Sequence, residues 1–293
     1  MNRFHYLILM LSILTHCYII KSRVVTLVDN NLKTSELLEQ LKNPSDVTKL
    51  DLSHNQLAKI DPEHFEELIN LVELDLSHNS LTSFDPKFVQ QCKKLKRLDL
   101  SYNKIETIKK FKSFFPKIAI LNCSHNKIRS LKTELFQSCK KLKDVDFSHN
   151  QLSSLKEIIS TPKIRYLDLA HNNIALSDFT ELEQAKKLAK LNLSHNQLNE
   201  IEIWPSLVRL RYLDLSHNQL SSLGACTATK SPEVIWIDIS ENNCISSDLL
   251  EPVTEFKSLV HLNLYGNNII EYKFLKPLKK RGCEILMNKN YFQ

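Results

Sequence analysis

The chain has 293 residues, of which 42% are hydrophobic and 25% are charged, so it can bury a large core and lacks the composition of a disordered protein. Only three glycines are present, which argues against the glycine-rich phosphate loops of nucleotide-binding enzymes. The formal net charge of +6 is modest for this length and does not by itself indicate a nucleic-acid-binding protein.

The beginning of the chain resembles a secretory signal. Arg3 precedes an apolar run from Leu7 to Ile20, which has the length of a signal-peptide core and is short for a membrane-spanning helix. We predict a signal peptide over residues 1–22, with cleavage after Cys17 as one placement and an uncleaved anchor as the alternative. No later segment is apolar enough to cross a bilayer, so we expect a secreted, extracellular product with no stable membrane span.

Next in the chain, Ser35–Lys42 is predicted to form a short helix, because a serine can cap its start and Pro44 follows its end. A repeat extends over the whole chain after the predicted signal, and in it one asparagine recurs at intervals of about 22 to 25 residues. These asparagines are Asn30, Asn55, Asn79, Asn103, Asn126, Asn150, Asn172, Asn196, Asn218, Asn242 and Asn267.

Apolar residues surround each asparagine in the order L-x-x-L-x-L-x-x-N-x-L, as in the copy from Leu71 to Leu81. This periodic pattern resembles the leucine-rich repeat family. The resemblance implies an α/β fold, a curved leucine-rich repeat solenoid with parallel strands on the concave face and irregular or helical segments on the convex side. It also implies a single domain over residues 23–293, with about ten to eleven repeats and short N- and C-terminal caps.

The repeated asparagine is predicted to have a structural task. Where the chain leaves a strand, buried N–H and C=O groups lose their ladder partners, and a carboxamide can donate and accept hydrogen bonds at once. We therefore expect these side chains to be buried against the backbone, so that Asn150→Leu would leave several buried polar groups unpaired.

The C-terminal end and the cysteines give further expectations. Residues 274–288, FLKPLKKRGCEILMN, are predicted to form a return helix and a last strand, without the cysteine clusters that extracellular members of the family usually carry at their ends. Cys226 and Cys283 are either free or a disulfide pair. No CxxC or HxxxH spacing occurs, so we expect no metal and no cofactor. The cysteines predicted to be buried thiols at apolar repeat positions are Cys92, Cys123, Cys139 and Cys244.

Side chains alternate along a strand, so the non-leucine positions face outward and stack into columns. One column is acidic, and a second one holds most of the histidines. The histidines either suit a solvated turn or form a pH-sensitive row, in which protonated neighbours repel by about 1 kcal/mol in water. The acidic column is Asp51, Asp75, Asp99, Asn122, Asp146, Asp168, Asn192, Asp214, Asp238 and Asn263. The second column is His54, His78, Tyr102, His125, His149, His171, His195, His217 and Glu241.

A basic stripe borders these columns at the edge where the chain enters each strand. It is either the solvated rim of a solenoid or a docking surface for an acidic protein or a sulfated glycan. Its residues are Lys93, Lys94, Lys96, Lys140, Lys141, Lys143, Arg165, Lys186, Lys187 and Arg211.

The position before the second leucine carries the strongest interaction signal, because aromatic side chains gather there toward the C-terminal half and RYLDL occurs twice. Exposed Tyr, Trp and Arg on a rigid sheet dominate binding energies at interfaces, whereas Trp204 in a return segment is predicted to be a core residue. The alternative is a chance surface cluster. The predicted partner-binding residues are Arg165, Tyr166, Asp168, Lys190, Arg211, Tyr212, Asp214, Trp236, Asp238 and His261.

Two N-x-S sequons lie in the acidic column, at Asn122 and Asn192. If the chain is secreted and both are glycosylated, sugars would shield the middle of the strand face and leave its aromatic C-terminal part open. The alternative is that strands present sequons poorly and that neither is used.

No catalytic constellation is evident, because the Asp, Ser and His of DLSH lie along one strand and its turn rather than around a pocket. We predict a non-enzymatic extracellular protein-binding module, similar to Toll-type receptor ectodomains and to soluble leucine-rich immune or adhesion proteins. Its expected partner is another protein, or an acidic or sulfated glycan at the basic edge, and not nucleic acid; the oligomeric state stays open. The alternative is an intracellular leucine-rich repeat scaffold or phosphatase-type regulator.

Overall fold

The computed structural model describes residues 24–28, 41, 43–109, 111, 115–131, 135–136, 138–154, 163–175, 179–223, 227–244, 250–269 and 273–288. The predicted signal peptide, most of the predicted helix at 35–42, Asn30 and Cys226 lie outside these residues. Within the described part of the chain, no helix is both long enough and apolar enough to cross a membrane.

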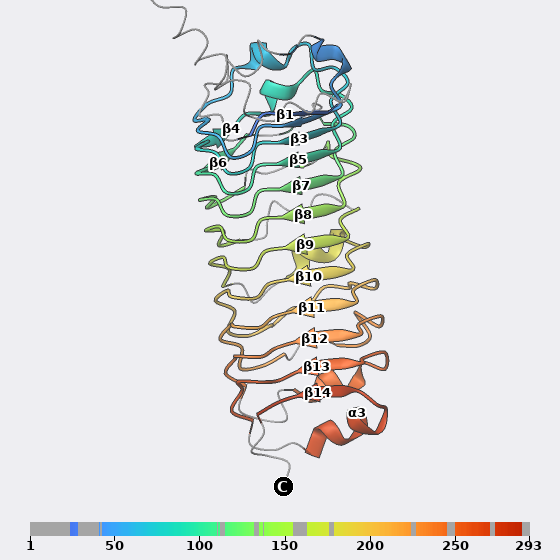
Figure 1. Cartoon of the computed structure of the whole chain (residues 1–293). Helices are drawn as coiled ribbons and strands as arrows, with labels where there is room; N and C mark the ends of the chain where they lie inside the picture. Colours follow the sequence, from blue (N-terminus) through green and yellow to red (C-terminus); the bar gives the residue numbers. More distant parts are fainter. Residues whose placement is uncertain are drawn as a thin grey trace, which may run out of the picture.

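A single sheet of 12 parallel strands, arranged in chain order, extends along the molecule (Figure 1). Neighbouring strands pair in register, so that Leu50 lies opposite Leu74 and Leu74 opposite Leu98. This sheet confirms the predicted solenoid of stacked repeats. Its strands are β1 (Val24–Thr26), β2 (Lys49–Asp51), β3 (Glu73–Asp75), β5 (Arg97–Asp99), β7 (Ile120–Asn122), β8 (Asp144–Asp146), β9 (Tyr166–Asp168), β10 (Lys190–Asn192), β11 (Tyr212–Asp214), β12 (Trp236–Asp238), β13 (His261–Asn263) and β14 (Glu284–Leu286).

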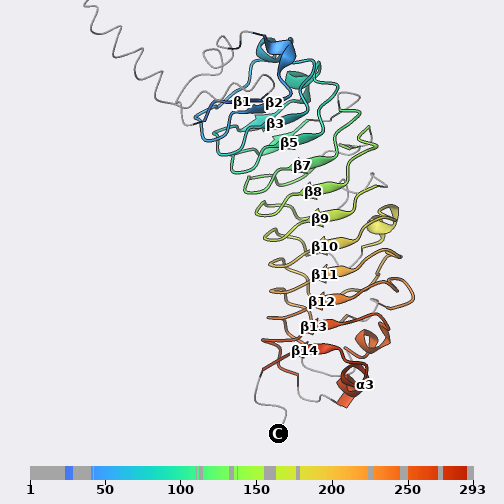
Figure 2. The same cartoon turned by 45° about the vertical axis from the view of Figure 1, so that its right-hand side comes forward.

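Return segments connect the strands on the other side of the core, and the stack curves with its strands on the inner side (Figure 2). Two short strands of the return side, β4 (Ser83–Phe84) and β6 (Thr107–Ile108), pair in a second sheet. The 3-10 helices are η1 (Pro44–Asp46), η2 (Pro62–Phe65), η3 (Pro86–Val89), η4 (Thr180–Gln184), η5 (Glu251–Glu255) and η6 (Lys273–Leu275), and the α-helix is α3 (Lys276–Lys280). The helix α3 and the strand β14 form the return helix and closing strand predicted for residues 274–288.

The core lies between the strands and the return segments. Each repeat contributes inward leucines, and Leu71, Leu74 and Leu76 are all no more than 1% exposed. Return segments add large rings, such as Phe111 and Phe136, whose centroids are 5.5 Å apart. Because every apolar layer continues into the next repeat, one hydrophobic cluster extends along the described chain, as expected of a solenoid whose single repeats cannot fold alone.

The described asparagines of the repeat are buried and bonded to the backbone, as predicted. Asn150 donates from Nδ2 to the carbonyl oxygens of Cys123, Phe147 and Ser148 at 2.9, 3.0 and 3.1 Å. Its Oδ1 accepts a hydrogen bond at 3.0 Å from the backbone N–H of Ile128, one repeat earlier. From Asn79 to Asn267, each side chain makes this same bridge to the preceding repeat. Each asparagine therefore closes its own turn and joins two repeats.

The four cysteines predicted as buried thiols are all buried. Burial raises the pKa of the Cys92, Cys139 and Cys244 thiols to about 12, so these groups stay protonated at neutral pH. Cys283 is also buried, and no disulfide joins it to another described cysteine. The described residues leave the alternative of a Cys226–Cys283 bridge untested, because Cys226 lies outside them.

Candidate functional site

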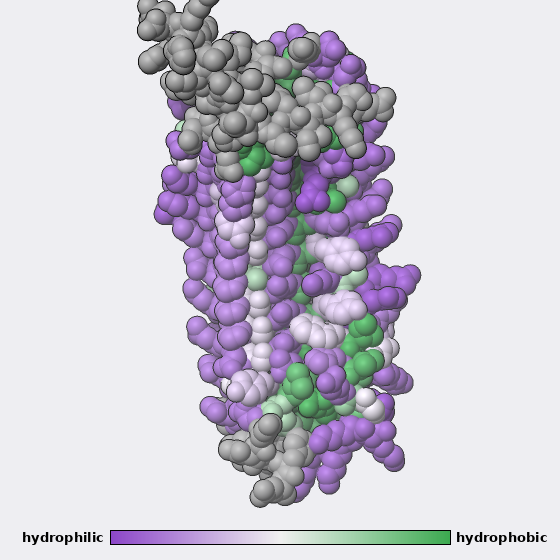
Figure 3. Space-filling view, viewed as in Figure 1, coloured by the Kyte–Doolittle hydropathy of each residue, from purple (hydrophilic) through white to green (hydrophobic). Residues whose placement is uncertain are grey.

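The inner strand face carries two outward positions per repeat, one before and one after the central buried residue of the strand. In β9, Tyr166 and Asp168 take these positions around buried Leu167. Figure 3 shows hydrophobic and pale aromatic side chains gathered on this face over the C-terminal strands. The strand face, defined by these two positions from β2 to β13, is the candidate binding surface.

The acidic column closes the turn that follows each strand. Asp75 Oδ1, for example, accepts a hydrogen bond from the backbone N–H of Ser77 at 2.9 Å, and the other aspartates of the column repeat this contact. Wherever an asparagine replaces the aspartate, its Nδ2 donates to Oδ2 of the preceding aspartate. These pairs are Asn122–Asp99, Asn192–Asp168 and Asn263–Asp238, at 3.1, 3.1 and 2.8 Å. The asparagines thus interrupt a row of like charges.

The predicted binding residues Asp168, Asp214 and Asp238 therefore have a structural role. Both carboxylate oxygens of Asp168 and of Asp238 accept hydrogen bonds from the turn and from the next strand. Burial raises the pKa of Asp168 and Asp214, and a neighbouring aspartate on an adjacent strand adds to each shift. We expect these carboxylates to support the face more than to contact a partner.

The two sequon asparagines are part of the same network. Asn122 Oδ1 accepts hydrogen bonds from the backbone and hydroxyl of Ser124, while its Nδ2 donates to Asp99. Asn192 Oδ1 accepts a hydrogen bond from the backbone N–H of Ser194, and its Nδ2 donates to Asp168. Each asparagine is half-buried and its amide nitrogen donates to an aspartate, so attachment of a sugar would first require this hydrogen bond to break.

The predicted aromatic cluster is present and lies in register on consecutive strands. Tyr166 and Tyr212 are 50% and 42% exposed, and Lys190 is exposed between them. Trp236 follows Tyr212 and is half-buried, with its ring stacked on His261 at a centroid distance of 6.0 Å. The structure thus brings together the aromatic part of the predicted site.

The two predicted arginines and the last predicted histidine lie beside this cluster. Arg165 and Arg211 are exposed at the strand-entry edge, and Arg211 Nε lies 3.5 Å from Glu233 Oε2. His261 Nδ1 lies 3.1 Å from Glu284 Oε2 on β14. Apolar surface continues beyond the rings, because Val260 is 61% exposed.

Sequence reasoning missed a hollow of about 290 Å³ near the middle of the strand face. Its centre is at Ile120 and Asp144, between the longer side chains of Arg97 and Tyr166. The sequence contains a signal for this hollow. At the position before the second leucine of each repeat, Ile120 and Asp144 are short, whereas the other repeats carry long or aromatic side chains there. Burial raises the pKa of Asp144, and Lys143 and Arg165 partly offset that shift. The hollow can accept a side chain next to charges of both signs.

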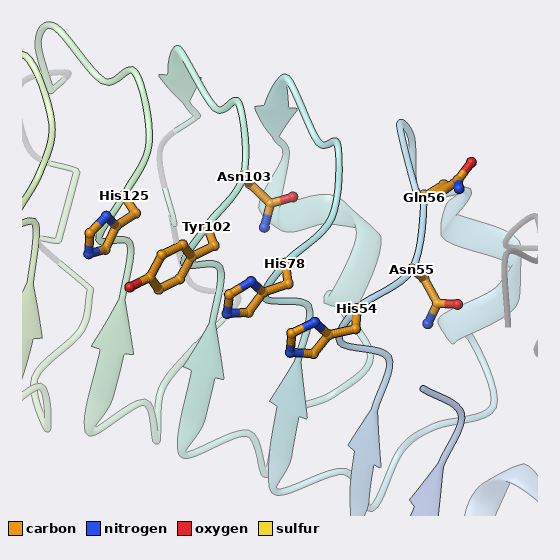
Figure 4. A pocket seen from close by; sticks show the side chains of 7 residues that line it. All are labelled: His54, Asn55, Gln56, His78, Tyr102, Asn103 and His125. Carbon is orange, nitrogen blue, oxygen red and sulfur yellow. The ribbon is translucent and has the colours of Figure 1, made fainter. Parts of the chain in front are cut away.

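The rings of the histidine column are stacked from His54 to His217, and Figure 4 shows the first four of them, from His54 to His125. Each residue has a left-handed backbone with φ between 51° and 54°, which directs its side chain to the same side at every turn. From His54 to His217, consecutive ring centroids lie 3.9 to 4.2 Å apart, with planes within 13° of parallel. Tyr102 takes one place in the stack. The stack is closer than the spacing of roughly 5 Å expected from strand pairing.

Protonation of three histidines in this stack is disfavoured. Partial burial lowers the pKa of His125, His171 and His195, and charge on neighbouring histidines lowers it further, while Asp146 opposes the shift at His125. Between the unfolded pKa of about 6.5 and these lower folded values, the unfolded chain binds protons that the folded chain does not. Stability is therefore expected to fall as the pH drops through the unfolded pKa of about 6.5 toward the lower folded pKa values.

A variant isolates this effect from that of the carboxylates. His171→Asn with His195→Asn keeps residues that tolerate the left-handed backbone but removes two titrating rings. Acidification should lower the melting temperature of both proteins. The decrease measured by thermal unfolding should be smaller in this variant than in the wild type, by at least about 2 °C. Equal losses in both proteins would assign the pH dependence to other groups.

The described residues hold no group of three or more His, Cys, Asp or Glu side chains placed to bind a metal ion. The Asp, Ser and His of each DLSH stretch are spread over a strand end and its turn. The serine takes part in the hydrogen bonds of the turn: Ser216, for example, donates from its backbone N–H and its hydroxyl to Asp214.

Comparisons with known proteins agree with this architecture. The family model described as leucine rich repeat matches residues 45–105 and 116–174, and a second model, of two leucine-rich repeat copies, matches residues 93–137 and 186–229. No curated protein matches the chain.

Several solved structures share the fold. The TLR13–ssRNA13 complex is 25% identical, with a TM-score of 0.77, over 87% of this chain and 38% of that chain. The functional domain of InlJ from Listeria monocytogenes is 21% identical, with a TM-score of 0.68, over 90% and 52%. The LRIM1/APL1C complex is 25% identical, with a TM-score of 0.64, over 82% and 49%. The chain thus spans between 38% and 52% of the length of these matched chains.

Proposed function

The chain belongs to the leucine-rich repeat family, and on that premise we propose that it is a non-enzymatic binding module that holds a protein partner on its strand face. The observation that carries this proposal is a row of side chains on consecutive hydrogen-bonded strands, in which Tyr166, Lys190 and Tyr212 are exposed and Trp236 is half-buried. Aromatic residues on a rigid support lose little conformational freedom on binding and bury large areas.

The hollow at Ile120 extends this surface toward the N-terminal half. A partner that covers Tyr212 and Trp236 and continues along the sheet would reach Tyr166 and then the hollow, because all lie at the same strand position. Such a partner would bury rings at one end and insert a side chain at the other. Arg97, Asp144 and Lys190 line the hollow and provide charges that fix its orientation.

We further propose that the module acts outside the cell, in recognition of the immune or adhesion type. The apolar run at residues 7–20 supports this proposal, and the complexes of TLR13 with ssRNA13 and of LRIM1 with APL1C show similar scaffolds holding other macromolecules. The intracellular scaffold is the second candidate, favoured by the free thiols of the described cysteines. N-terminal sequencing of the protein expressed in eukaryotic cells separates the two, because only the secreted form loses its first residues.

Tyr212→Ala combined with Trp236→Ala is expected to weaken partner binding at least about tenfold, because central aromatic residues contribute about 2 kcal/mol or more each. The partner is first identified by cross-linking to the wild-type chain, and its affinity is then measured by surface plasmon resonance with purified proteins. Single-stranded RNA is included as a competitor, since we predict that nucleic acid is not a partner.

The matched control replaces two exposed apolar residues outside the strands, Ile69→Ala and Ile203→Ala, which are 49% and 42% exposed. This variant should bind like the wild type. If the aromatic variant also keeps full affinity, the partner binds elsewhere and the proposed site is wrong. If RNA competes for the same site, the ligand of the strand face would be a nucleic acid and not a protein.

A further inference from the structure

The strongest charge feature outside the strand face is a line of cations on its rim. Lys94, Lys117, Lys141, Lys163 and Lys187 occupy the same position of consecutive repeats, immediately before the first buried apolar residue, and all are exposed. We name these five residues the lysine line. In Figure 3, hydrophilic side chains project along the edge of the molecule beside the pale rings.

The backbone holds this line in a regular array. Two residues after each lysine, the backbone N–H donates a hydrogen bond to the carbonyl oxygen of the equivalent residue in the preceding repeat. Lys143 N–H thus donates to Ala119 O at 2.9 Å, and Arg165 N–H donates to Lys143 O at 2.7 Å. Parallel strands lie about 4.8 Å apart, so the line extends over roughly 19 Å. Neighbouring charges therefore lie within a Debye length of about 10 Å, and their potentials add.

Little negative charge compensates the line. We define the rim positions of a repeat as the two residues before its first buried apolar residue and the one residue after it. In the five repeats that contain β5, β7, β8, β9 and β10, none of these positions is Asp or Glu. Among the described residues, no ion pair involves Lys117, Lys141, Lys163 or Lys187. One repeat beyond Lys187, Arg209 pairs with Glu233 at 2.7 Å, and the uncompensated stretch ends there.

From this arrangement we propose that the lysine line binds a linear sulfated glycan. Evenly spaced ammonium groups attract sulfates as point charges and need no planar partner. A flexible polyanion that lies along the line releases its counterions at each contact, which makes binding strong at low salt.

Other polyanions fit the rim less well. The aromatic side chains that could stack on nucleic-acid bases, Tyr166 and Tyr212, stand on the strand face rather than between the lysines. The uncharged rim residues among the lysines, Pro116, Ala119 and Ala189, are small and provide no aromatic anchor of the kind that dominates protein interfaces. A glycan needs neither feature.

The test uses fluorescent heparin oligosaccharide as the probe, with the full chain, at about 50 and about 200 mM salt. The triple variant Lys141→Glu, Lys163→Glu and Lys187→Glu is expected to bind at least tenfold more weakly than the wild type at low salt. The control variant Lys104→Glu, Lys127→Glu and Lys276→Glu changes the net charge equally on other exposed surfaces and should remain within about twofold. Melting temperatures verify that both variants are folded, and Lys→Gln at the same three rim positions gives a second, milder test.

Three results would overturn the proposal. Equal weakening in both triple variants would show attraction by net charge alone. Equal affinity for desulfated heparin would remove the sulfates as the recognised groups, and tighter binding of single-stranded RNA that the rim variant abolishes would assign the line to nucleic acid. Tyr212→Ala with Trp236→Ala should leave heparin binding unchanged, so the glycan proposal and the protein-binding proposal fail independently.

Discussion

Replacement of Asn150 by leucine is expected to lower the free energy of unfolding by about 3–5 kcal/mol. The side chain is 7% exposed and makes three donor contacts and one acceptor contact with the backbone of two repeats. Leucine has a similar size but no polar atom, so the N–H of Ile128 and the carbonyls of Cys123 and Phe147 would be left without this partner in the core. Urea unfolding followed by circular dichroism measures the loss.

The control for this prediction is another asparagine on the next repeat. Asn173 directly follows the buried Asn172 but is exposed, and its Oδ1 lies 3.5 Å from Gln197 Nε2. Asn173→Leu should change stability by no more than about 0.5 kcal/mol. If Asn150→Leu lowered the free energy of unfolding as little as Asn173→Leu, the hydrogen bonds of the buried asparagine would not be needed to hold neighbouring repeats together.

The two tryptophans of the chain are expected to behave in opposite ways. Trp204→Ala should lower the free energy of unfolding by about 3–5 kcal/mol, because the ring is 1% exposed in the core and its loss leaves a cavity. Its Nε1–H also donates to the hydroxyl of Ser231 at 3.1 Å, and Ser231 is fully buried. The variant thus removes both packing and a hydrogen-bond partner.

Trp236→Ala is the matched comparison. Its ring lies half-buried on the strand face against His261, so its removal should change stability by no more than about 1 kcal/mol while it weakens partner binding. Urea midpoints followed by circular dichroism test stability in both variants without tryptophan fluorescence. A large loss of stability in Trp236→Ala would make this residue part of the core and remove it from the candidate site.

Much of the candidate site could be predicted because its residues occupy fixed places in the repeat. The exposure of Tyr166 and Tyr212 follows from strand alternation alone, and so does their common face. By contrast, strand alternation predicts a partner-binding role for Asp168 but not that its carboxylate closes a turn and accepts a hydrogen bond from Asn192. The outward position of a polar side chain does not show whether its polar atoms already form hydrogen bonds with neighbouring residues.

The sequence by itself determined the architecture, because period, inward leucines and the turn asparagine are all properties of a single repeat that is copied along the chain. Only the tertiary structure decided what neighbouring repeats do to one another: the hollow at Ile120, the asparagine–aspartate bonds and the stacking of the histidine rings. These features depend on distances of 3 to 6 Å between side chains that are 20 or more residues apart in sequence. Such distances are set by how the strands stack and how each side chain rotates, and neither is encoded in the order of residues within one repeat.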